Sequence, residues 1–181
     1  PRSTSSAASD VYKRQELTGP SLSRLRPKLR QTAMALWGLY LILTLLEMIA
    51  LKFIGGMSTF DAINHAFTTM PSGGFSTHDS SIAYYDSSTI EIIIIVFMFL
   101  AGVNFTLMWL MGAGDFKAAI KDEEFRTYLV YISAAVVLIT VSLVLVGVAL
   151  GQAVLDTLFH VLSIGTSTGY ASVLNLNCLL Y

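Results

Sequence analysis

Long apolar stretches dominate this chain and are separated by shorter polar segments. Three of the stretches match the roughly 20 residues that a helix needs to cross the hydrocarbon core of a bilayer; they are residues 32–54, 90–111 and 128–150. Two further helical segments, residues 59–70 and 153–164, are too short to cross. The pattern predicts an all-α, polytopic membrane protein in which a short helix follows the first span and another follows the third.

Residues that cap or break helices set the expected boundaries. Ser58 or Thr59 is expected to cap the first short helix, because a hydroxyl there accepts a hydrogen bond from an unpaired backbone N–H. Gly151 is expected to separate the third span from the second short helix. Pro20 and Pro27 are expected to break any long helix before the first span.

The two short helices and the turns after them repeat one sequence pattern. Asp61–His65 and Ser72–Phe75 recur as Asp156–His160 and Ser167–Tyr170, at a constant offset of 95 residues (156 − 61 = 95). A repeat at fixed spacing indicates one supersecondary unit that is used more than once.

A glycine stands at the same place in both turns. Gly74 is followed by Phe75, and Gly169 by Tyr170. This register predicts a positive φ at each glycine, which other residues adopt only under strain. The alternative is that each turn is an ordinary helix C-cap. Two copies at one offset, each after a span and each too short to cross, favour a pore-lining turn instead.

The overall composition excludes an ordinary soluble domain. Hydrophobic residues make up 54% of the chain and charged residues 13%, with a mean hydropathy of +0.66. The net charge of −1 gives no case for binding nucleic acid. The one cysteine, Cys178, allows neither a disulfide framework nor a thiolate metal site.

The position of the charges predicts an orientation. Lys and Arg gather in residues 16–31 and 112–127, which are therefore expected to be cytoplasmic, whereas residues 76–88 contain none and are expected outside. Three spans satisfy this bias only if neither short helix crosses the membrane. Residues 59–76 and 153–172 are therefore predicted to be re-entrant pore helices with filter turns.

Irregular backbone at membrane depth is tolerated only where it is buried in protein or lines a wet cavity. Backbone carbonyls and Ser or Thr hydroxyls in such turns can replace the hydration shell of an alkali ion, and no carboxylate cluster favours a divalent ion. We therefore expect a weakly held monovalent cation as the substrate, with no resident cofactor, no divalent site and no catalytic residue. The predicted filter residues are Ser72, Gly73, Gly74, Phe75, Ser167, Thr168, Gly169 and Tyr170.

An Asp and a His stand four residues apart in each short helix. Asp61 with His65, and Asp156 with His160, would be metal ligands if all four converged. Since each pair belongs to its own unit, packing and hydrogen bonding behind the filter is the favoured role.

Two polar residues lie inside the spans. Glu47 is a functional candidate by its position, although Lys52 nearby offers a simpler reading as its neighbour at the membrane boundary. Asn104 is expected to hydrogen-bond another helix.

The two ends of the chain are set aside from the fold. Residues 5–15 match one reading frame of a common sequencing-library adapter, and residues 178–181 match its reverse complement, so residues 1–15 and 178–181 are excluded. Both segments are expected to be adapter translation, the first of them disordered. The native protein is then expected to extend beyond both ends.

Three motifs carry a resemblance to a known family. They are Gly73-Gly-Phe-Ser-Thr-His-Asp79, Ser167-Thr-Gly-Tyr-Ala171 and Asp122-Glu-Glu-Phe-Arg126. In this order they resemble the Trk/Ktr/HKT superfamily of potassium transporters, most closely its bacterial TrkH branch, over residues 16–177.

The resemblance implies four membrane–pore–membrane units around a pseudo-fourfold axis, each with one key filter glycine. Residues 32–111 would be the second unit and residues 128–177 the front of the third, so the chain alone is not expected to conduct. The implied function is potassium uptake across the bacterial cytoplasmic (inner) membrane. Implied partners are membrane lipid, a second copy in a homodimer and a cytoplasmic nucleotide-binding regulatory subunit, with no nucleic acid.

Three alternatives remain at this point. The first is a sodium-permeable or other monovalent cation channel. The second is an intramembrane metalloenzyme that uses the His and Asp pairs, and the third is a purely structural membrane protein.

Overall fold

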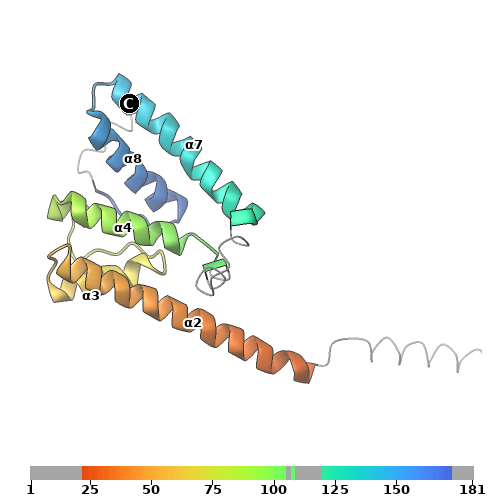
Figure 1. Ribbon diagram of the computed structural model, residues 1–181. Coiled ribbons are helices and arrows are strands. Elements are labelled where there is room, and N and C mark those ends of the chain that lie inside the picture. Colours follow the sequence, from red (N-terminus) through yellow and green to blue (C-terminus); the bar gives the residue numbers. More distant parts are fainter. Residues whose placement is uncertain (1–21, 105–106, 109–119, 173–181) are drawn as a thin grey trace, which may run out of the picture. The chain divides into compact units, whose positions relative to one another are not determined.

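The computed structural model describes residues 22–104, 107–108 and 120–172. These residues form α2 (Leu22–Phe53), α3 (Thr59–Thr69), the 3-10 helix η1 (Ser81–Tyr85), α4 (Ser88–Ala101), α7 (Glu123–Leu145) and α8 (Leu150–Gly165) (Figure 1). The all-α prediction is confirmed, since the described residues contain helices and loops but no strand. The segments interpreted as adapter translation lie outside the described residues, as does Cys178.

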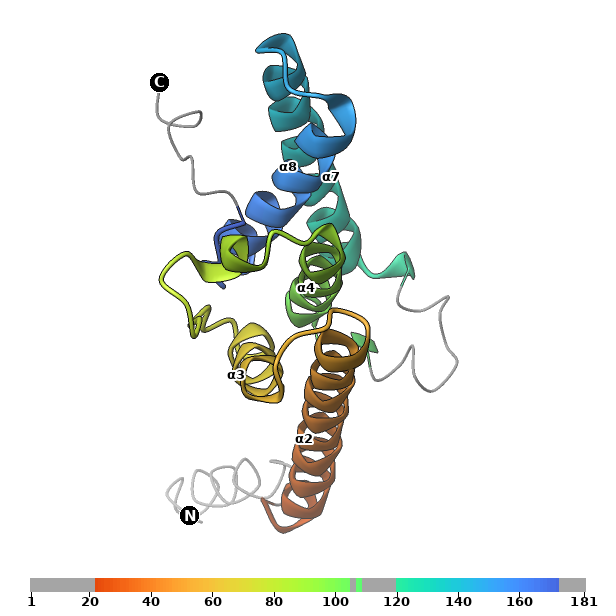
Figure 2. The ribbon, with the colours of Figure 1, turned by 90° about the vertical axis from the view of Figure 1, so that its left-hand side faces the viewer.

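The chain divides into two compact units, residues 1–37 and residues 38–181. The boundary falls within α2, and the packing and the candidate site described below belong to the second unit. In that unit α8 lies between α7 and α4 and contacts both (Figure 1). The loop between α3 and α4 reaches the segment that follows α8 (Figure 2).

Two apolar clusters hold the second unit together. The larger includes Leu51 of α2, Ile94 of α4 and Phe159 of α8, all fully buried. The smaller joins Leu43 of α2 to Met70 at the end of α3. Burial of such side chains stabilises each by about 1.5–3 kcal/mol, so the short helices are fixed by packing against the longer ones.

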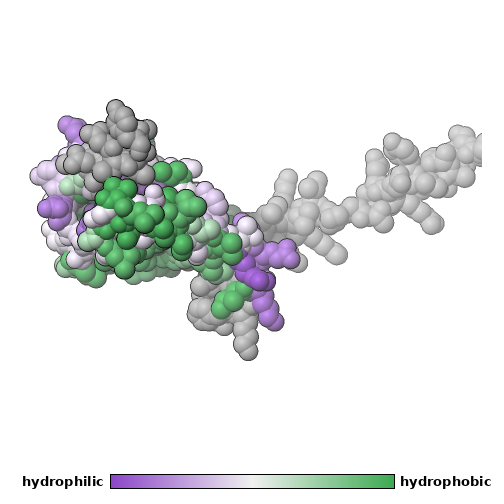
Figure 3. All heavy atoms as spheres, turned by 90° about the horizontal axis from the view of Figure 1, so that it is seen from above, coloured by the Kyte–Doolittle hydropathy of each residue, from purple (hydrophilic) through white to green (hydrophobic). Residues whose placement is uncertain are grey.

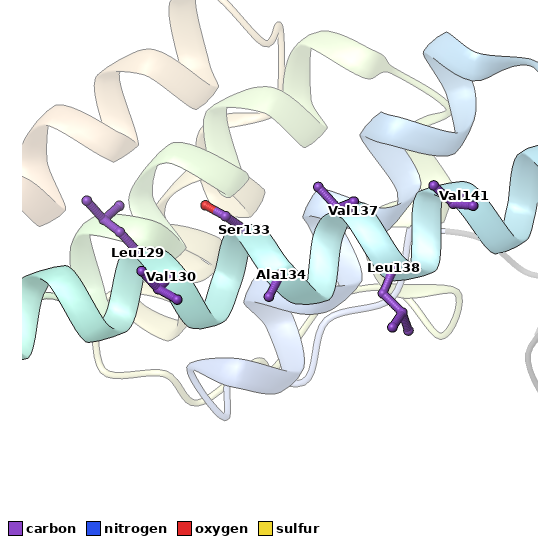
Figure 4. Close-up of a pocket in the computed structure, with 7 residues that line it drawn as sticks. All are labelled: Leu129, Val130, Ser133, Ala134, Val137, Leu138 and Val141. Carbon is purple, nitrogen blue, oxygen red and sulfur yellow. The ribbon is translucent and has the colours of Figure 1, made fainter.

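The surface is also apolar, as expected for a protein in lipid. Within the part of the chain that the structure describes, two helices are long and apolar enough to cross a membrane, Ala33–Phe53 and Glu123–Leu145. Much of the coloured surface in Figure 3 is hydrophobic. One face of α7 presents a shallow, open strip of small and aliphatic side chains (Figure 4), lined by Leu129, Val130, Ser133, Ala134, Val137, Leu138 and Val141. Because every lining residue comes from one helix, this strip encloses no site.

The two short helices cannot cross a bilayer. α3 has 11 residues and α8 has 16, which at 1.5 Å per residue gives lengths of about 17 and about 24 Å. The hydrocarbon core is about 30 Å thick. The lengths therefore agree with the prediction that neither segment spans. The helix α4, with 14 residues, is also shorter than the hydrocarbon core, so length alone does not separate the two short helices from the second predicted span.

The break between the third span and α8 falls earlier than predicted. It lies at Gly147, whose φ is +101°, and not at Gly151, which is inside α8. Correspondingly α7 covers 123–145 where the sequence predicted 128–150, because the Asp122 side chain caps it by accepting from the Phe125 N–H. A φ of +101° strongly favours glycine, and the sequence offered two glycines for this break, Gly147 and Gly151.

Pro27 does not break the first helix, contrary to prediction. α2 begins at Leu22 and continues through this proline. Near the N-terminal end of a helix few carbonyls precede the proline, so its missing N–H removes a single hydrogen bond there.

The helix of the second span ends ten residues before its predicted end, residue 111. α4 stops at Ala101 and Gly102 is its C-cap. A Cβ at Gly102 would overlap the Tyr128 hydroxyl and lie 2.9 Å from Cγ2 of Thr166, so the glycine lets α7 and α8 approach closely. Asn104 follows and donates to Glu124 of α7 at 3.2 Å, as predicted for a residue that bonds another helix.

Candidate functional site

The turn after α3 is built from hydrogen bonds to the last carbonyls of that helix. The N–H of Ser72 donates to the carbonyl of Thr69 at 2.9 Å. The N–H groups of Gly73 and Gly74 both donate to the carbonyl of Thr68, at 2.8 and 3.1 Å. These bonds satisfy helix carbonyls that would otherwise lack partners and curl the chain tightly at the helix end.

The same backbone path occurs after α8. The N–H of Ser167 donates to the Ile164 carbonyl at 3.0 Å, and that of Gly169 to the Ser163 carbonyl at 3.1 Å. Each of these bonds lies 95 residues from its counterpart in the first turn. The repeat read from the sequence is therefore a repeat of hydrogen bonds.

Both turns contain two residues with positive φ. Gly74 has a φ of +62° and Gly169 one of +85°, as predicted. Ser72 and Ser167 are also positive, at +56° and +61°. Sequence reasoning missed the serines, although their occurrence at the same offset was the available signal. A positive φ is costly for a residue with a Cβ, and the serine at this place has one in both turns.

A side-chain hydroxyl fixes the end of each turn from behind. Thr68 Oγ1 donates to the carbonyl oxygen of Phe75 at 2.8 Å, and Ser163 Oγ donates to that of Tyr170 at 2.7 Å. These positions again differ by 95 residues. The carbonyls of the two aromatic residues therefore point back toward the short helices. Of the residues before them, Gly73, Ser167 and Gly169 are exposed, whereas Thr168 is buried.

After the first turn the chain runs back along α3. Three contacts follow the helix from its C-terminal to its N-terminal end: Thr68 Oγ1 with the Phe75 carbonyl, His65 Nε2 with Ser76 Oγ at 3.1 Å, and Thr77 Oγ1 with Asp61 Oδ1 at 2.7 Å. The segment thus enters and leaves on the same side. This geometry agrees with a re-entrant loop.

The side chains of Asp61 and His65 hydrogen-bond the returning segment to α3. Asp61 also accepts from Ser58 Oγ at 2.7 Å, and the hydrogen bonds from Thr77 and Ser58 hold the pKa of its carboxyl below its usual value. The other ring nitrogen of His65, Nδ1, contacts the carbonyl oxygen of Asp61 at 2.8 Å. The expected role in packing and hydrogen bonding is confirmed for this pair.

The second pair keeps only part of this arrangement. His160 Nδ1 contacts the carbonyl of Asp156 at 2.7 Å, as in the first copy, but the hydroxyl of Ser76 has no counterpart because residue 171 is alanine. Among the described residues no three His, Cys, Asp or Glu side chains are grouped to hold a metal. The four residues therefore do not form the metal centre considered from the sequence.

The two glycine turns meet. A Cβ at Gly74 would overlap the carbonyl oxygen of Thr168 and lie 2.8 Å from its carbonyl carbon. At Gly169 a Cβ would meet nothing within 4 Å in the described chain. The structure thus brings together two segments 95 residues apart, and it does so through backbone atoms, as a site built of carbonyls requires.

Tyr170 joins the second turn to the first short helix. Its ring is buried, with 2% of its surface exposed, and its hydroxyl lies 2.5 Å from Thr68 Oγ1 and 3.3 Å from the His65 carbonyl. Either hydroxyl can be the donor in the contact between Thr68 and Tyr170. Phe75, its counterpart in the first turn, is 76% exposed. Nothing in the sequence pointed to this contact between the two repeats.

The loop after the first turn holds the second turn as well. The N–H groups of Ile82 and Ala83 both donate to the Ala171 carbonyl at 3.1 Å, and the Ala171 N–H donates to Ser81 Oγ at 3.3 Å. Both the N–H and the carbonyl group of Ala171 are therefore hydrogen-bonded. The polar loop after the first turn therefore holds the second turn by three hydrogen bonds to its backbone.

Comparison with known proteins agrees with this geometry. A family model described as TrkH, cation transport protein, matches residues 8–177; its first residues overlap the segment that we interpret as adapter translation. The chain is 39% identical over 165 residues to the Trk system potassium uptake protein TrkH of Salmonella typhimurium and 37% identical over 163 residues to that of Escherichia coli K12. Each alignment covers 88% of this chain and 34% of the relative.

A solved structure shows the same fold. The crystal structure of the potassium transporter TrkH from Vibrio parahaemolyticus matches with a TM-score of 0.76 and 36% identity, over 81% of this chain and 32% of that one. The chain spans about a third of the length of these relatives. The resemblance inferred from the three motifs is confirmed, and the chain belongs to the TrkH family of cation transport proteins.

Proposed function

We propose that this chain forms part of the pore of a potassium uptake protein in the bacterial cytoplasmic membrane. The observation that carries the proposal is the meeting of two equivalent glycine turns, Gly74 against the carbonyl of Thr168. Each turn ends a helix too short to cross and is held by the same hydrogen bonds. The relatives named above are potassium uptake proteins of Trk systems, which supports potassium as the substrate.

The ion would be held by backbone oxygens of the two turns. The carbonyls of Phe75 and Tyr170 accept hydrogen bonds from Thr68 and Ser163, so they are committed to the helices behind the turns. The Thr168 hydroxyl is buried and pairs with the Thr166 hydroxyl at 2.8 Å. The ligands we favour are the carbonyl oxygens of the six residues before the aromatics, Ser72, Gly73, Gly74, Ser167, Thr168 and Gly169.

Carbonyl oxygens suit an alkali ion because they replace its water shell without a charge that would hold it too tightly. The short helices add to this attraction, since their C-terminal ends carry partial negative charge and face the turns. Potassium is the substrate in this proposal, and the protein is a transporter that carries out no reaction. We further propose that the full-length protein works as a dimer with a cytoplasmic nucleotide-binding regulatory subunit, as the family resemblance implies.

Uptake in cells tests the proposal. The full-length gene that contains this chain is expressed in bacteria that lack potassium uptake, and growth and ion flux are measured at low external potassium. Wild type should restore growth, whereas Gly74→Ser and Gly169→Ser should lower potassium affinity or admit sodium. Gly151→Ser is the matched control, because Gly151 lies in α8 with no atom within 4 Å of the added Cβ; it should behave as wild type.

Three results would count against the proposal. If the wild-type protein is expressed but does not restore growth, potassium uptake is rejected as the function. Rescue by wild type with both filter variants silent would leave the turns as ordinary helix ends. A wild type that passes sodium as readily as potassium would replace the proposal with the sodium-permeable alternative.

A further inference from the structure

The peptide group between Tyr170 and Ala171, directly after the second filter turn, is held from two sides. Its carbonyl oxygen, on Tyr170, accepts from Ser163 Oγ at 2.7 Å, and its N–H, on Ala171, donates to Ser81 Oγ at 3.3 Å. Ser163 belongs to α8, the short helix of the same repeat, whereas Ser81 begins η1 in the loop of the first repeat. Because a peptide group is planar, two hydroxyls from different repeats fix the orientation of one rigid plane.

The next peptide group is held by the same loop. The N–H groups of Ile82 and Ala83 both donate to the Ala171 carbonyl at 3.1 Å. Three hydrogen bonds from one loop therefore converge on a single residue of the second repeat. Ser81 itself has a φ of +56°, and a positive φ in a residue with a Cβ persists only where the surrounding structure holds it. The strain lies at the residue whose hydroxyl meets the second turn.

The loop that carries Ser81 is fixed to the first short helix. The Ser81 N–H donates to the His78 carbonyl at 3.0 Å, and the His78 ring stacks on Tyr84 with the ring centroids 3.6 Å apart. Two residues before the stack begins to form the loop, Thr77 Oγ1 donates to Asp61 Oδ1 of α3 at 2.7 Å. The loop thus connects the first short helix to the backbone of the second turn.

We propose that Ser81 is a positioning residue of the second filter turn, whose hydroxyl sets the orientation of the peptide group after Tyr170 and so of the carbonyls that precede it. Ser81 does not touch the ion. The orientation matters because carbonyl oxygens have to replace the hydration shell of the ion. The inference rests on the proposed function for its effect on transport, whereas the hydrogen bond to Ala171 is tested without it.

Uptake by variants of the full-length transporter tests the effect on the filter. Ser81→Ala removes the hydroxyl and keeps the Cβ; it should raise the KM for potassium about fivefold, the effect of one lost hydrogen bond. Ser81→Gly removes the same hydroxyl and adopts a positive φ without strain, so it should raise the KM equally. Ser80→Ala is the matched control, because the neighbouring Ser80 makes no side-chain capping bond to η1; it should keep the wild-type KM.

The KM and the maximal rate separate positioning from a merely structural role. A variant that only folds less well leaves fewer transporters in the membrane, which lowers the maximal rate and leaves the KM unchanged. An unchanged KM in both hydroxyl-free variants would therefore overturn the proposal, whatever their maximal rates. If Ser81→Ala fails to fold, Ser81→Gly decides, because the glycine is free of the backbone strain.

Hydrogen–deuterium exchange of the purified full-length protein tests the hydrogen bond without transport. The Ala171 amide should exchange about fivefold faster in Ser81→Ala and Ser81→Gly than in wild type, and at the wild-type rate in Ser80→Ala. Wild-type exchange in both hydroxyl-free variants would overturn the inference, even in a protein that takes up potassium. Failure of the wild type to take up potassium would reject the proposed function instead, and the exchange rates would still decide whether Ser81 holds this peptide.

Discussion

The carbonyl oxygen of Thr168 occupies the space in which a side chain at Gly74 would begin. These two residues lie 94 positions apart (168 − 74 = 94) in different repeats of the chain. Glycine is favoured at position 74 on two separate grounds. Its φ is +62°, and a Cβ there would collide with the backbone of Thr168.

Gly74→Ala should therefore destabilise the protein by more than the ~1–2 kcal/mol that an L-residue loses in the left-handed region. The excess comes from the collision, because a peptide carbonyl cannot rotate away as a flexible side chain could. Thermal unfolding of the purified full-length protein measures the loss. Gly151→Ala, in a helix with open space around it, should be neutral or slightly stabilising. Equal unfolding temperatures for the two variants would contradict the close contact.

Tyr170→Phe removes the hydroxyl that joins the second turn to the first short helix. We expect a loss of about 1 kcal/mol in unfolding free energy and weaker potassium binding, because Thr68 loses a hydrogen-bond partner. Tyr131→Phe is the control, since Tyr131 is 63% exposed on α7. Unfolding in detergent and uptake kinetics check both variants, and an unchanged Tyr170→Phe protein would show that the ring alone supports the filter.

The hydroxyls behind the turns should be required in both copies. Ser163→Ala leaves the buried Tyr170 carbonyl without its donor, at a cost of about 1–3 kcal/mol, and Thr68→Val should act similarly on Phe75. Thr68→Ser keeps the hydroxyl and imitates the second copy, so it should be tolerated. Ser133→Ala on the open face of α7 is the control. Uptake and thermal stability are measured for all variants. Equal behaviour of Thr68→Ser and Thr68→Val would show that the hydroxyl behind the first turn is not required.

The bonds to Asp61 predict a specific pH dependence. Its pKa lies below the ordinary value because Thr77 and Ser58 donate to the ionised form. Stability from such a group is complete above its unfolded pKa of about 3.9 and is lost as pH falls through the lower folded pKa. The difference in unfolding temperature between wild type and Asp61→Asn should thus be constant from about pH 7 to 5 and shrink below about pH 4.

A control in the same loop sharpens that experiment. Asp79 is exposed and follows the hairpin. The Asp79→Asn variant should therefore have the same unfolding temperature as wild type at every pH. A difference for Asp61→Asn that persists unchanged at the lowest pH would show that the hydrogen bonds, rather than the charge, carry the effect.

The sequence by itself determined the helical membrane class, the two short helices and the repeated turns. It could do so because apolar length, glycine position and a constant offset are properties of the chain alone. The positive φ at Gly74 and Gly169 followed from the same information. Helix ends were less certain: two glycines competed for the break that fell at Gly147, and a proline near a helix start did not stop α2.

Only the tertiary structure decided what touches what between the repeats. The hydrogen bond between Tyr170 and Thr68, and the one from the Ala171 N–H to Ser81, both join segments that are distant in sequence. Such contacts depend on how the helices pack, which no local pattern encodes. The repeated glycine turns could thus be found from the chain, whereas the atoms that hold them in place required the fold.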